Sequence, residues 1–139
     1  MKKIKFPGEY IKEGRFVLNS GLESNIKYEV EELLTNPLYL NYVLDNIPLS
    51  EHYIGIASGG ALMAIAAHSR FSMVKKNEFY GEKPEGAWVL IDDVVTTDGS
   101  LNKAIKLIKR KPDKIIVAVD RRDLEGTIKT LEVISLFQI

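Results

Sequence analysis

One stretch, residues 88–101, constrains the fold of this chain more than any other. It begins with an unbroken apolar run over 88–91, a pattern typical of a strand buried on both faces of a parallel sheet. Asp92 and Asp93 follow, where we expect the strand to end, and after a short loop Ser100 opens a helical pattern. This order of strand, acidic pair, loop and helix predicts an α/β fold with a central parallel sheet.

The same stretch predicts a site for a sugar phosphate. Open α/β sheets bind ligands beyond the carboxyl ends of their strands, and backbone N–H groups at the start of a helix attract phosphate. Asp92 and Asp93 can accept hydrogen bonds from ribose hydroxyls or hold a magnesium ion through water. A purely structural alternative is that the acidic pair ends a strand and that residues 98–100 form a turn and a helix cap.

Composition narrows the class of protein. The 139 residues are enough for one core, so we treat residues 1–139 as a single domain. Nineteen basic residues balance nineteen acidic ones, and this balance disfavours nucleic acid and membrane surfaces as partners. Cysteine is absent, which excludes disulfides and thiolate metal sites and fits a cytoplasmic location. No apolar run approaches the roughly 20 residues needed to span a bilayer.

The N-terminal part of the chain predicts a β-hairpin. Phe16 and Leu18 lie at alternating positions, as on one face of a strand; residues 20–21 are Ser-Gly, and a second strand is expected through Ile26 and Tyr28. The residues alone do not indicate its purpose.

A second strand-to-helix junction lies in the middle of the sequence. The apolar run 53–57 leads into Ser58, Gly59 and Gly60, and a helical pattern follows. Two adjacent glycines allow backbone amides to approach an anion closely, although a simple strand-to-helix turn would use them equally well.

The rest of the chain continues the α/β pattern. Residues 71–74 predict a strand, and the polar stretch 75–86 predicts a mobile loop. Residues 101–111 predict an amphipathic helix, followed by a buried strand over 114–119. Residues 120–123, Asp-Arg-Arg-Asp, would on their own be interpreted as a surface ion cluster.

Taken together, these segments resemble the type I phosphoribosyltransferases, and among them the orotate phosphoribosyltransferase family. Residues 88–101 are similar to the family's signature for phosphoribosyl pyrophosphate (PRPP). Residues 14–24 resemble its N-terminal motif, residues 55–60 its pyrophosphate loop, and residues 74–81 its catalytic loop. The Asp-Arg pair at 120–121 resembles a base-binding pair at a strand end.

The resemblance implies a fold and a reaction. The fold would be a central parallel sheet flanked by helices, with a small hood made of about residues 1–35 and the C-terminal strand. The reaction would transfer the phosphoribosyl group from PRPP to orotate, giving orotidine 5′-monophosphate (OMP) and pyrophosphate. Mg²⁺ would be the cofactor, held through PRPP and water with no direct protein ligand. A homodimer is also implied.

The resemblance also implies roles for individual residues. Lys75 and Lys76 would cover the pyrophosphate, Asp92 and Asp93 would hold the ribose hydroxyls, and Arg121 would face the base. The implied base-binding residues are Thr96 and Arg121, the implied catalytic residues are Lys75, Lys76, Asp92 and Asp93, and the implied PRPP-binding residues are Ser58, Gly59, Gly60, Asp92, Asp93, Thr96, Thr97, Asp98, Gly99 and Ser100.

Two departures from the family pattern leave alternatives open. Asp98 stands where the family has glycine, and we expect its carboxylate to oppose the phosphate. The second lysine of the catalytic loop is absent, and Phe79 is nearest to its position. A PRPP-binding regulatory relative with little or no turnover, or an enzyme for another base, would fit these departures as well.

Overall fold

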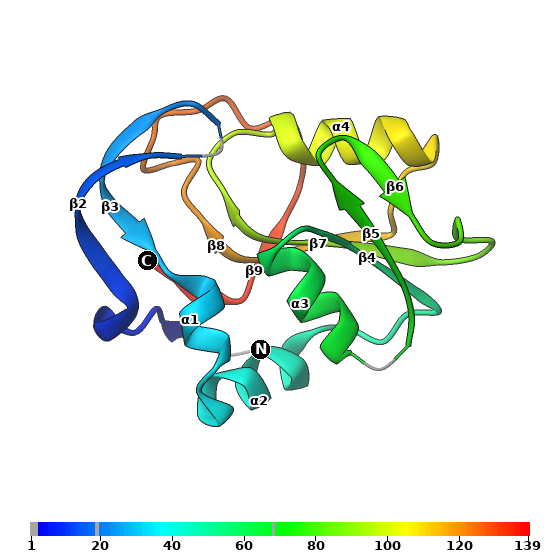
Figure 1. The fold of residues 1–139 in the computed structure, drawn as a ribbon, viewed down its shortest axis with the longest axis horizontal. Helices are drawn as coiled ribbons and strands as arrows, with labels where there is room; N and C mark the ends of the chain where they lie inside the picture. Colours follow the sequence, from blue (N-terminus) through cyan, green and yellow to red (C-terminus); the bar gives the residue numbers. More distant parts are fainter. Residues whose placement is uncertain (1–2, 19, 68) are drawn as a thin grey trace.

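A computed structural model describes residues 3–18, 20–67 and 69–139, and a six-stranded sheet forms its centre (Figure 1). The strand order is β6-β5-β4-β7-β8-β9, and every neighbouring pair is parallel except β5 and β6. The predicted central parallel sheet is therefore confirmed. Its strands are β4 (His52–Ile56), β5 (Arg70–Lys75), β6 (Glu78–Tyr80), β7 (Trp88–Val95), β8 (Lys114–Asp120) and β9 (Ile134–Ser135).

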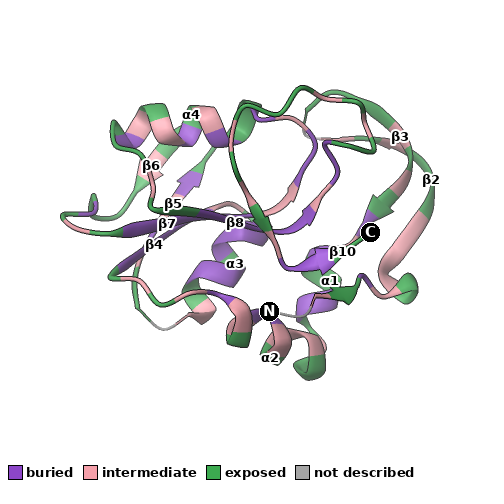
Figure 2. Ribbon diagram, turned by 180° about the vertical axis from the view of Figure 1, so that it is seen from behind, coloured by how far each residue is buried: buried purple, intermediate pink, exposed green. Residues whose placement is uncertain are grey.

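Helices cover both faces of this sheet (Figures 1 and 2). Helix α3 (Gly59–Ala66) connects β4 to β5, and α4 (Gly99–Ile108) connects β7 to β8 from the opposite face. Helices α1 (Val30–Leu34) and α2 (Pro37–Asn46) lie on the same side as α3. The flanking helices of the predicted fold are thus present. None of the helices in the described part of the chain is long and apolar enough to cross a membrane.

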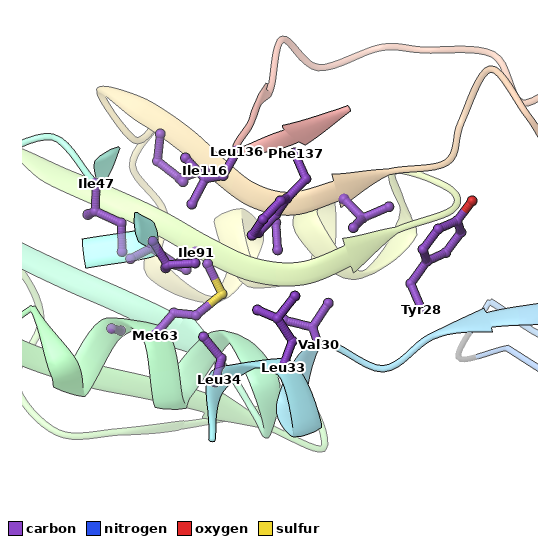
Figure 3. Close-up of a cluster of buried hydrophobic side chains, with 14 of the residues drawn as sticks. Tyr28, Val30, Leu33, Leu34, Ile47, Met63, Ile91, Ile116, Leu136 and Phe137 are labelled. Carbon is purple, nitrogen blue, oxygen red and sulfur yellow. The ribbon is translucent and has the colours of Figure 1, made fainter. Parts of the chain in front are cut away.

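The apolar start of β7 is explained by burial on both faces. Val89 and Ile91 belong to the cluster under α1, α2 and α3, where Figure 3 shows Ile91 beside Met63. Trp88 and Leu90 belong to the other cluster, beneath α4. Because successive side chains of a strand point to opposite faces, a strand covered on both sides needs a continuous apolar run.

A hood stands beside the sheet, as predicted. Strands β2 (Ile11–Val17) and β3 (Glu23–Tyr28) form the expected antiparallel hairpin, preceded by the short 3-10 helix η1 (Gly8–Tyr10). Strand β1 (Ile4–Lys5) pairs in parallel with β10 (Phe137–Gln138). These pairings bring segments from the two ends of the sequence together beside the hairpin.

Two predicted boundaries are wrong by a few residues. Strand β7 continues to Val95, because Val94 and Val95 still pair with β8, so the acidic pair lies within the strand rather than after it. Helix α4 spans Gly99–Ile108 and not residues 101–111. It ends early because Lys109 adopts a left-handed conformation with φ of 63°, which stops the helix before Pro112.

The mobile loop expected over residues 75–86 is replaced at its start by a tight hairpin. Strand β6 pairs antiparallel with β5, and Lys75 lies opposite Glu78. Lys76 and Asn77 form the turn, with φ values of 50° and 62°. Two central residues with positive φ are the signature of a type I′ turn, whose twist matches that of the flanking strands. The hairpin was not predicted because its turn lacks the glycine by which type I′ turns are usually recognised in a sequence.

Candidate functional site

The strand order places the candidate site between β4 and β7. From β4 the chain continues to β5, toward one edge of the sheet. From β7 it continues to β8, toward the opposite edge. A crevice forms at such a reversal, beyond the carboxyl ends of the two strands, and ligands of open α/β sheets bind there. The segments that leave these two strands carry Ser58–Gly60 and residues 96–100, so the two predicted anion loops meet at one place.

The acidic pair lies on β7, one of the two strands at this reversal. Asp92 is 7% exposed, and one of its carboxylate oxygens accepts a hydrogen bond of 2.8 Å from the backbone N–H of Asp93. Asp93 accepts a similar bond of 2.8 Å from the N–H of Val94. Burial, followed by the neighbouring charge of Asp93, raises the pKa of Asp92 well above its usual range. Keeping Asp92 ionised at this position therefore has an energetic cost for the folded protein.

The two glycines of the pyrophosphate loop pack against the acidic pair. A Cβ added to Gly59 would overlap the carboxylate of Asp93, and one added to Gly60 would overlap the carbonyl oxygen of Ile91. Glycine is therefore needed here for the close approach of α3 to β7. The Ser58 hydroxyl donates to the Glu31 carboxylate at the mouth of the same loop.

Residues 96–100 form the second loop and the start of α4. The N–H of Gly99 donates to the Thr97 hydroxyl at 3.4 Å, and Gly99 and Ser100 are the first residues of the helix. The free N–H groups of a helix start and its positive dipole end favour a phosphate group. The structure thus gives the predicted phosphate loop a suitable local geometry.

Asp98 does not behave as expected in this loop. Its carboxylate is buried and accepts hydrogen bonds from Nη1 of Arg122 at 2.9 Å and from the N–H and hydroxyl of Thr130 at 2.5 Å each. Burial alone would raise its pKa, but the bonds from Thr130 and Arg122 outweigh burial and lower the pKa of Asp98. The sequence did not predict this arrangement, in which the carboxylate is paired with Arg122 and turned toward Thr130.

Arg121 and Thr96 line one small cavity between the hood and the sheet. The cavity has a volume of about 120 Å³, and its remaining lining residues are Val17, Leu18, Lys27, Tyr28, Asp93 and Val94. Two residues predicted to face the base, Thr96 and Arg121, are therefore brought together beside the acidic pair. The cavity is the candidate base site.

Arg121 is also the main polar connection between the sheet and the hood. The guanidinium is 1% exposed and donates to the carbonyl of Ile26 at 3.2 Å, the hydroxyl of Ser24 at 2.9 Å and the carboxylate of Glu125 at 2.6 Å. It lies 5.2 Å from the ring centre of Tyr28. The interpretation of residues 120–123 as a surface ion cluster is wrong for Arg121 and Arg122, since both are buried.

Lys75 and Lys76 lie at the same edge of the sheet as the pyrophosphate loop. The N–H of Ala57 donates to the carbonyl of Val74 at 2.8 Å. Val74 therefore lies beside Ala57, and the two lysines come next after Val74 in the sequence. They are exposed and stand on the tight β5–β6 hairpin rather than on a long loop.

Several residues around the site were missed from the sequence. Glu125 pairs with Arg121, and Thr127 donates from its hydroxyl to the carbonyl of Thr96 at 2.8 Å. Arg122 completes the ion pair with Asp98 at 2.9 Å. In the sequence, the ion pair of Asp98 with Arg122 was indicated only by an aspartate at a family glycine position and by a second arginine at position 122.

The donor set suits a magnesium ion held through water. Among residues 3–18, 20–67 and 69–139, no three His, Cys, Asp or Glu side chains gather closely enough to hold a metal directly. Asp92 and Asp93 nevertheless supply hard oxygen donors beside two anion loops. Mg²⁺ commonly keeps several waters and binds through one or two carboxylates together with substrate phosphates.

Comparison with known proteins gives a consistent set of relatives. No protein-family model matches the chain. The orotate phosphoribosyltransferase of Methanocaldococcus jannaschii is 31% identical over 143 residues, which cover 88% of this chain and 80% of the relative. That of Pyrococcus furiosus is 32% identical over 148 residues, covering 89% and 80% of the two chains.

Solved structures agree with these relatives. The orotate phosphoribosyltransferase of Aeropyrum pernix superimposes with a TM-score of 0.70 at 27% identity, over 85% of this chain and 80% of that one. An adenine phosphoribosyltransferase from Rhodothermus marinus has a TM-score of 0.63 at 15% identity, over 94% and 95% of the two chains. The second likeness concerns the fold alone, which is that of type I phosphoribosyltransferases.

Proposed function

Because this chain belongs to the orotate phosphoribosyltransferase family, we propose that it transfers the phosphoribosyl group of PRPP to orotate, giving OMP and pyrophosphate. One observation carries the proposal: two anion loops, an acidic pair and a small cavity with a buried arginine converge where the strand order reverses. Each part of PRPP and orotate has a chemical counterpart in this arrangement.

The sugar phosphate would be held by β7 and the start of α4. Asp92 and Asp93 would accept hydrogen bonds from the ribose 2′- and 3′-hydroxyls. The hydroxyls and N–H groups of residues 96–100 would hold the 5′-phosphate, which also gains from the helix dipole. This fixes the ribose while positive charge develops on its ring in an oxocarbenium-like transition state.

The leaving pyrophosphate would lie at the end of β4. Ser58, Gly59 and Gly60 would contact it through backbone N–H groups, and the ammonium groups of Lys75 and Lys76 would approach it from β5. When bound, Mg²⁺ would neutralise further charge on the pyrophosphate. Catalysis would come from fixed orientation of the reactants and from stabilising the departing negative charge.

The base would enter the cavity lined by Thr96 and Arg121. The guanidinium of Arg121 pairs with Glu125, but its Nε–H is buried with no hydrogen-bond partner among the described residues. Orotate carries a carboxylate that could accept this hydrogen bond. Bases without a carboxylate would leave the donor unsatisfied, which supports orotate over other bases.

A cytoplasmic homodimer is part of the same proposal. The absence of cysteine is compatible with a reducing compartment. Apolar side chains of Leu38 on α2 and of Leu62 and Ile65 on α3 are exposed, and exposed apolar side chains suit a contact between subunits.

The decisive experiment is a PRPP-dependent assay with Mg²⁺ and orotate, in which chromatography follows the formation of OMP. Adenine, guanine, hypoxanthine and uracil replace orotate in parallel reactions. We expect product with orotate and little with the other bases. Product with another base alone would contradict the assignment of orotate. PRPP binding by calorimetry without product would contradict turnover, a result that the short Lys76-Asn77 turn would help to explain.

A further inference from the structure

The segment that follows β8 is fastened to the proposed phosphate loop. Residues 121–133 return the chain to β9 without forming a helix. Two sets of contacts join this segment to residues 96–98. The hydroxyl of Thr127 donates to the carbonyl of Thr96 at 2.8 Å, and the N–H groups of Thr130 and Leu131 donate to Oδ2 of Asp98 at 2.5 and 3.1 Å.

Arg122 pairs with Asp98 in the same network and shares its charge with Asp120. Arg122 is 3% exposed and donates from Nη1 to Asp98 at 2.9 Å and to the carbonyl of Leu131 at 2.7 Å. Its Nε and Nη2 donate to Asp120 at 3.0 and 2.9 Å. Arg122 therefore connects the end of β8, the start of α4 and the returning segment through charge-assisted bonds, which are the stronger class of hydrogen bond.

Asp98 occupies a position from which it can set the start of α4. It is the residue before the first helical residue, and its carbonyl accepts the hydrogen bond of Asn102 N–H at 2.9 Å. Its side chain does not cap the helix, since it points to the returning segment. A carboxylate fixed by several donor groups holds the backbone of the adjacent residues in one orientation, and these residues carry the N–H groups proposed for the 5′-phosphate.

We propose that Asp98 is a positioning residue, which orients the 5′-phosphate loop by joining it to Arg122 and to residues 130–131. This inference rests on the proposed function, because it takes residues 96–100 to be the phosphate loop. The aspartate at this family glycine position, which suggested a defective site, then becomes part of the site's support. The helix-free segment 121–133 provides the other half of that support.

The test is the variant Asp98→Asn, which keeps the size of the side chain and removes its charge. The new amide would turn its N–H₂ group toward the donors of Thr130 or Arg122, so the network would open. We expect the KM for PRPP to rise about tenfold, equivalent to about 1.4 kcal/mol. The KM for orotate should change by less than about twofold, because orotate would meet this loop only at Thr96 and the carboxylate of Asp98 does not line the base cavity.

Binding of a nucleotide and its nucleoside gives a readout that general damage would not reproduce. Calorimetry with OMP and with orotidine, which lacks the 5′-phosphate, measures how much the phosphate adds to affinity. In Asp98→Asn this advantage should shrink about tenfold while orotidine binding stays unchanged. An equal loss for both ligands, or no loss for OMP, would overturn the proposal.

Two further variants keep the test independent of folding. Thr127→Val removes the bond to Thr96 and keeps the side-chain volume. We expect the ratio of OMP affinity to orotidine affinity to fall about threefold in this variant. The control is Asp123→Asn in the same segment, since the Asp123 side chain is 82% exposed and pairs on the surface with Lys129. It should behave as the wild type. If the wild-type protein binds neither OMP nor PRPP, the proposed function itself fails. If the wild type binds both ligands and Asp98→Asn binds them equally well, only the role of Asp98 fails.

Discussion

Asp92 and Asp98 are both buried aspartates, six positions apart, yet their surroundings act on them in opposite directions. Asp92 has a neighbouring carboxylate and few donors, so its ionised form is disfavoured. Asp98 has an arginine and several donors, so its ionised form is favoured. In a ligand site, the first arrangement keeps acceptor oxygens free for the substrate. The second arrangement suits a residue that holds the backbone in a fixed position.

The raised pKa of Asp92 gives a prediction for stability. Between the ordinary pKa of an aspartate and the raised pKa of Asp92, the native state keeps a proton that the unfolded state has lost. The free energy of unfolding should therefore fall as the pH rises through this range. In Asp92→Asn this contribution should vanish, and the variant should be more stable than the wild type at neutral pH. Urea unfolding across a pH series measures both effects.

The same variant should bind OMP less well, because an amide offers one acceptor oxygen in place of two. Lower stability of Asp92→Asn at neutral pH would show that the buried charge carries no cost. Unchanged affinity for OMP would show that Asp92 does not contact the ribose.

Gly59 gives a second prediction at the scale of single residues. An added Cβ would overlap the carboxylate of Asp93, so either α3 or the carboxylate must move. We expect Gly59→Ala to lower the free energy of unfolding by roughly 1–3 kcal/mol, in the range of other overpacked sites. Thermal or urea unfolding tests this. Gly8→Ala is the control, since nothing lies within 4 Å of its Cβ position, and it should change stability by less than about 0.5 kcal/mol.

The elements of the sheet were predictable to the extent that periodicity determines them. The apolar run of β7 predicted a strand covered on both faces, and the alternation of Phe16 and Leu18 predicted the β2–β3 hairpin. The β5–β6 hairpin was missed because Lys76-Asn77 carries no glycine, and its left-handed backbone is set by the pairing on either side. Local sequence preference cannot reveal a turn that the flanking strands impose.

This hairpin can be tested through its turn. Asn77 has φ of 62°, a conformation that glycine adopts without strain. We therefore expect Asn77→Gly to raise the free energy of unfolding by roughly 0.5–1 kcal/mol and Asn77→Val to lower it by roughly 1–2 kcal/mol. Urea unfolding of the two variants provides the measurement. Equal stabilities would mean that residues 75–78 do not form a type I′ turn in solution.

At the scale of the whole molecule, the sequence predicted which segments the fold brings together at the candidate site but not the contacts by which they support one another. Asp92, Asp93 and the glycine pair could be singled out because they lie toward or just beyond the carboxyl ends of strands, and parallel strands end at one edge. The ion pair of Asp98 with Arg122 joins residues that are distant in sequence, and the bonds of Arg121 to Ser24 and Ile26 span the chain even more widely. Such contacts depend on the assembled fold, so no local pattern could predict them.

The proposed homodimer gives a prediction at this scale. Light scattering should give a mass about twice the 15.7 kDa of one chain. Leu62 is 48% exposed on α3, and Leu62→Asp should yield a monomer with an unchanged fold by circular dichroism. The matched control is Leu49→Asp, because Leu49 is 99% exposed and lies in the segment between α2 and β4. A dimer that persists in Leu62→Asp would exclude this surface as the contact, and a monomeric wild-type protein would contradict the dimer.

The pairing of β1 with β10 has a consequence for how the protein is made. The neighbouring strands β4, β5, β7 and β8 are supplied by residues 52–120, so the central sheet can form while later residues are still being added. Ile4, by contrast, finds its partner Phe137 only after residue 137 has left the ribosome. Phe6 packs edge-on against Tyr28 and Phe137, and its contact with Phe137 forms equally late. During synthesis the protein should therefore pass through a state with an assembled sheet and an open hood, in which apolar surface is exposed to chaperones.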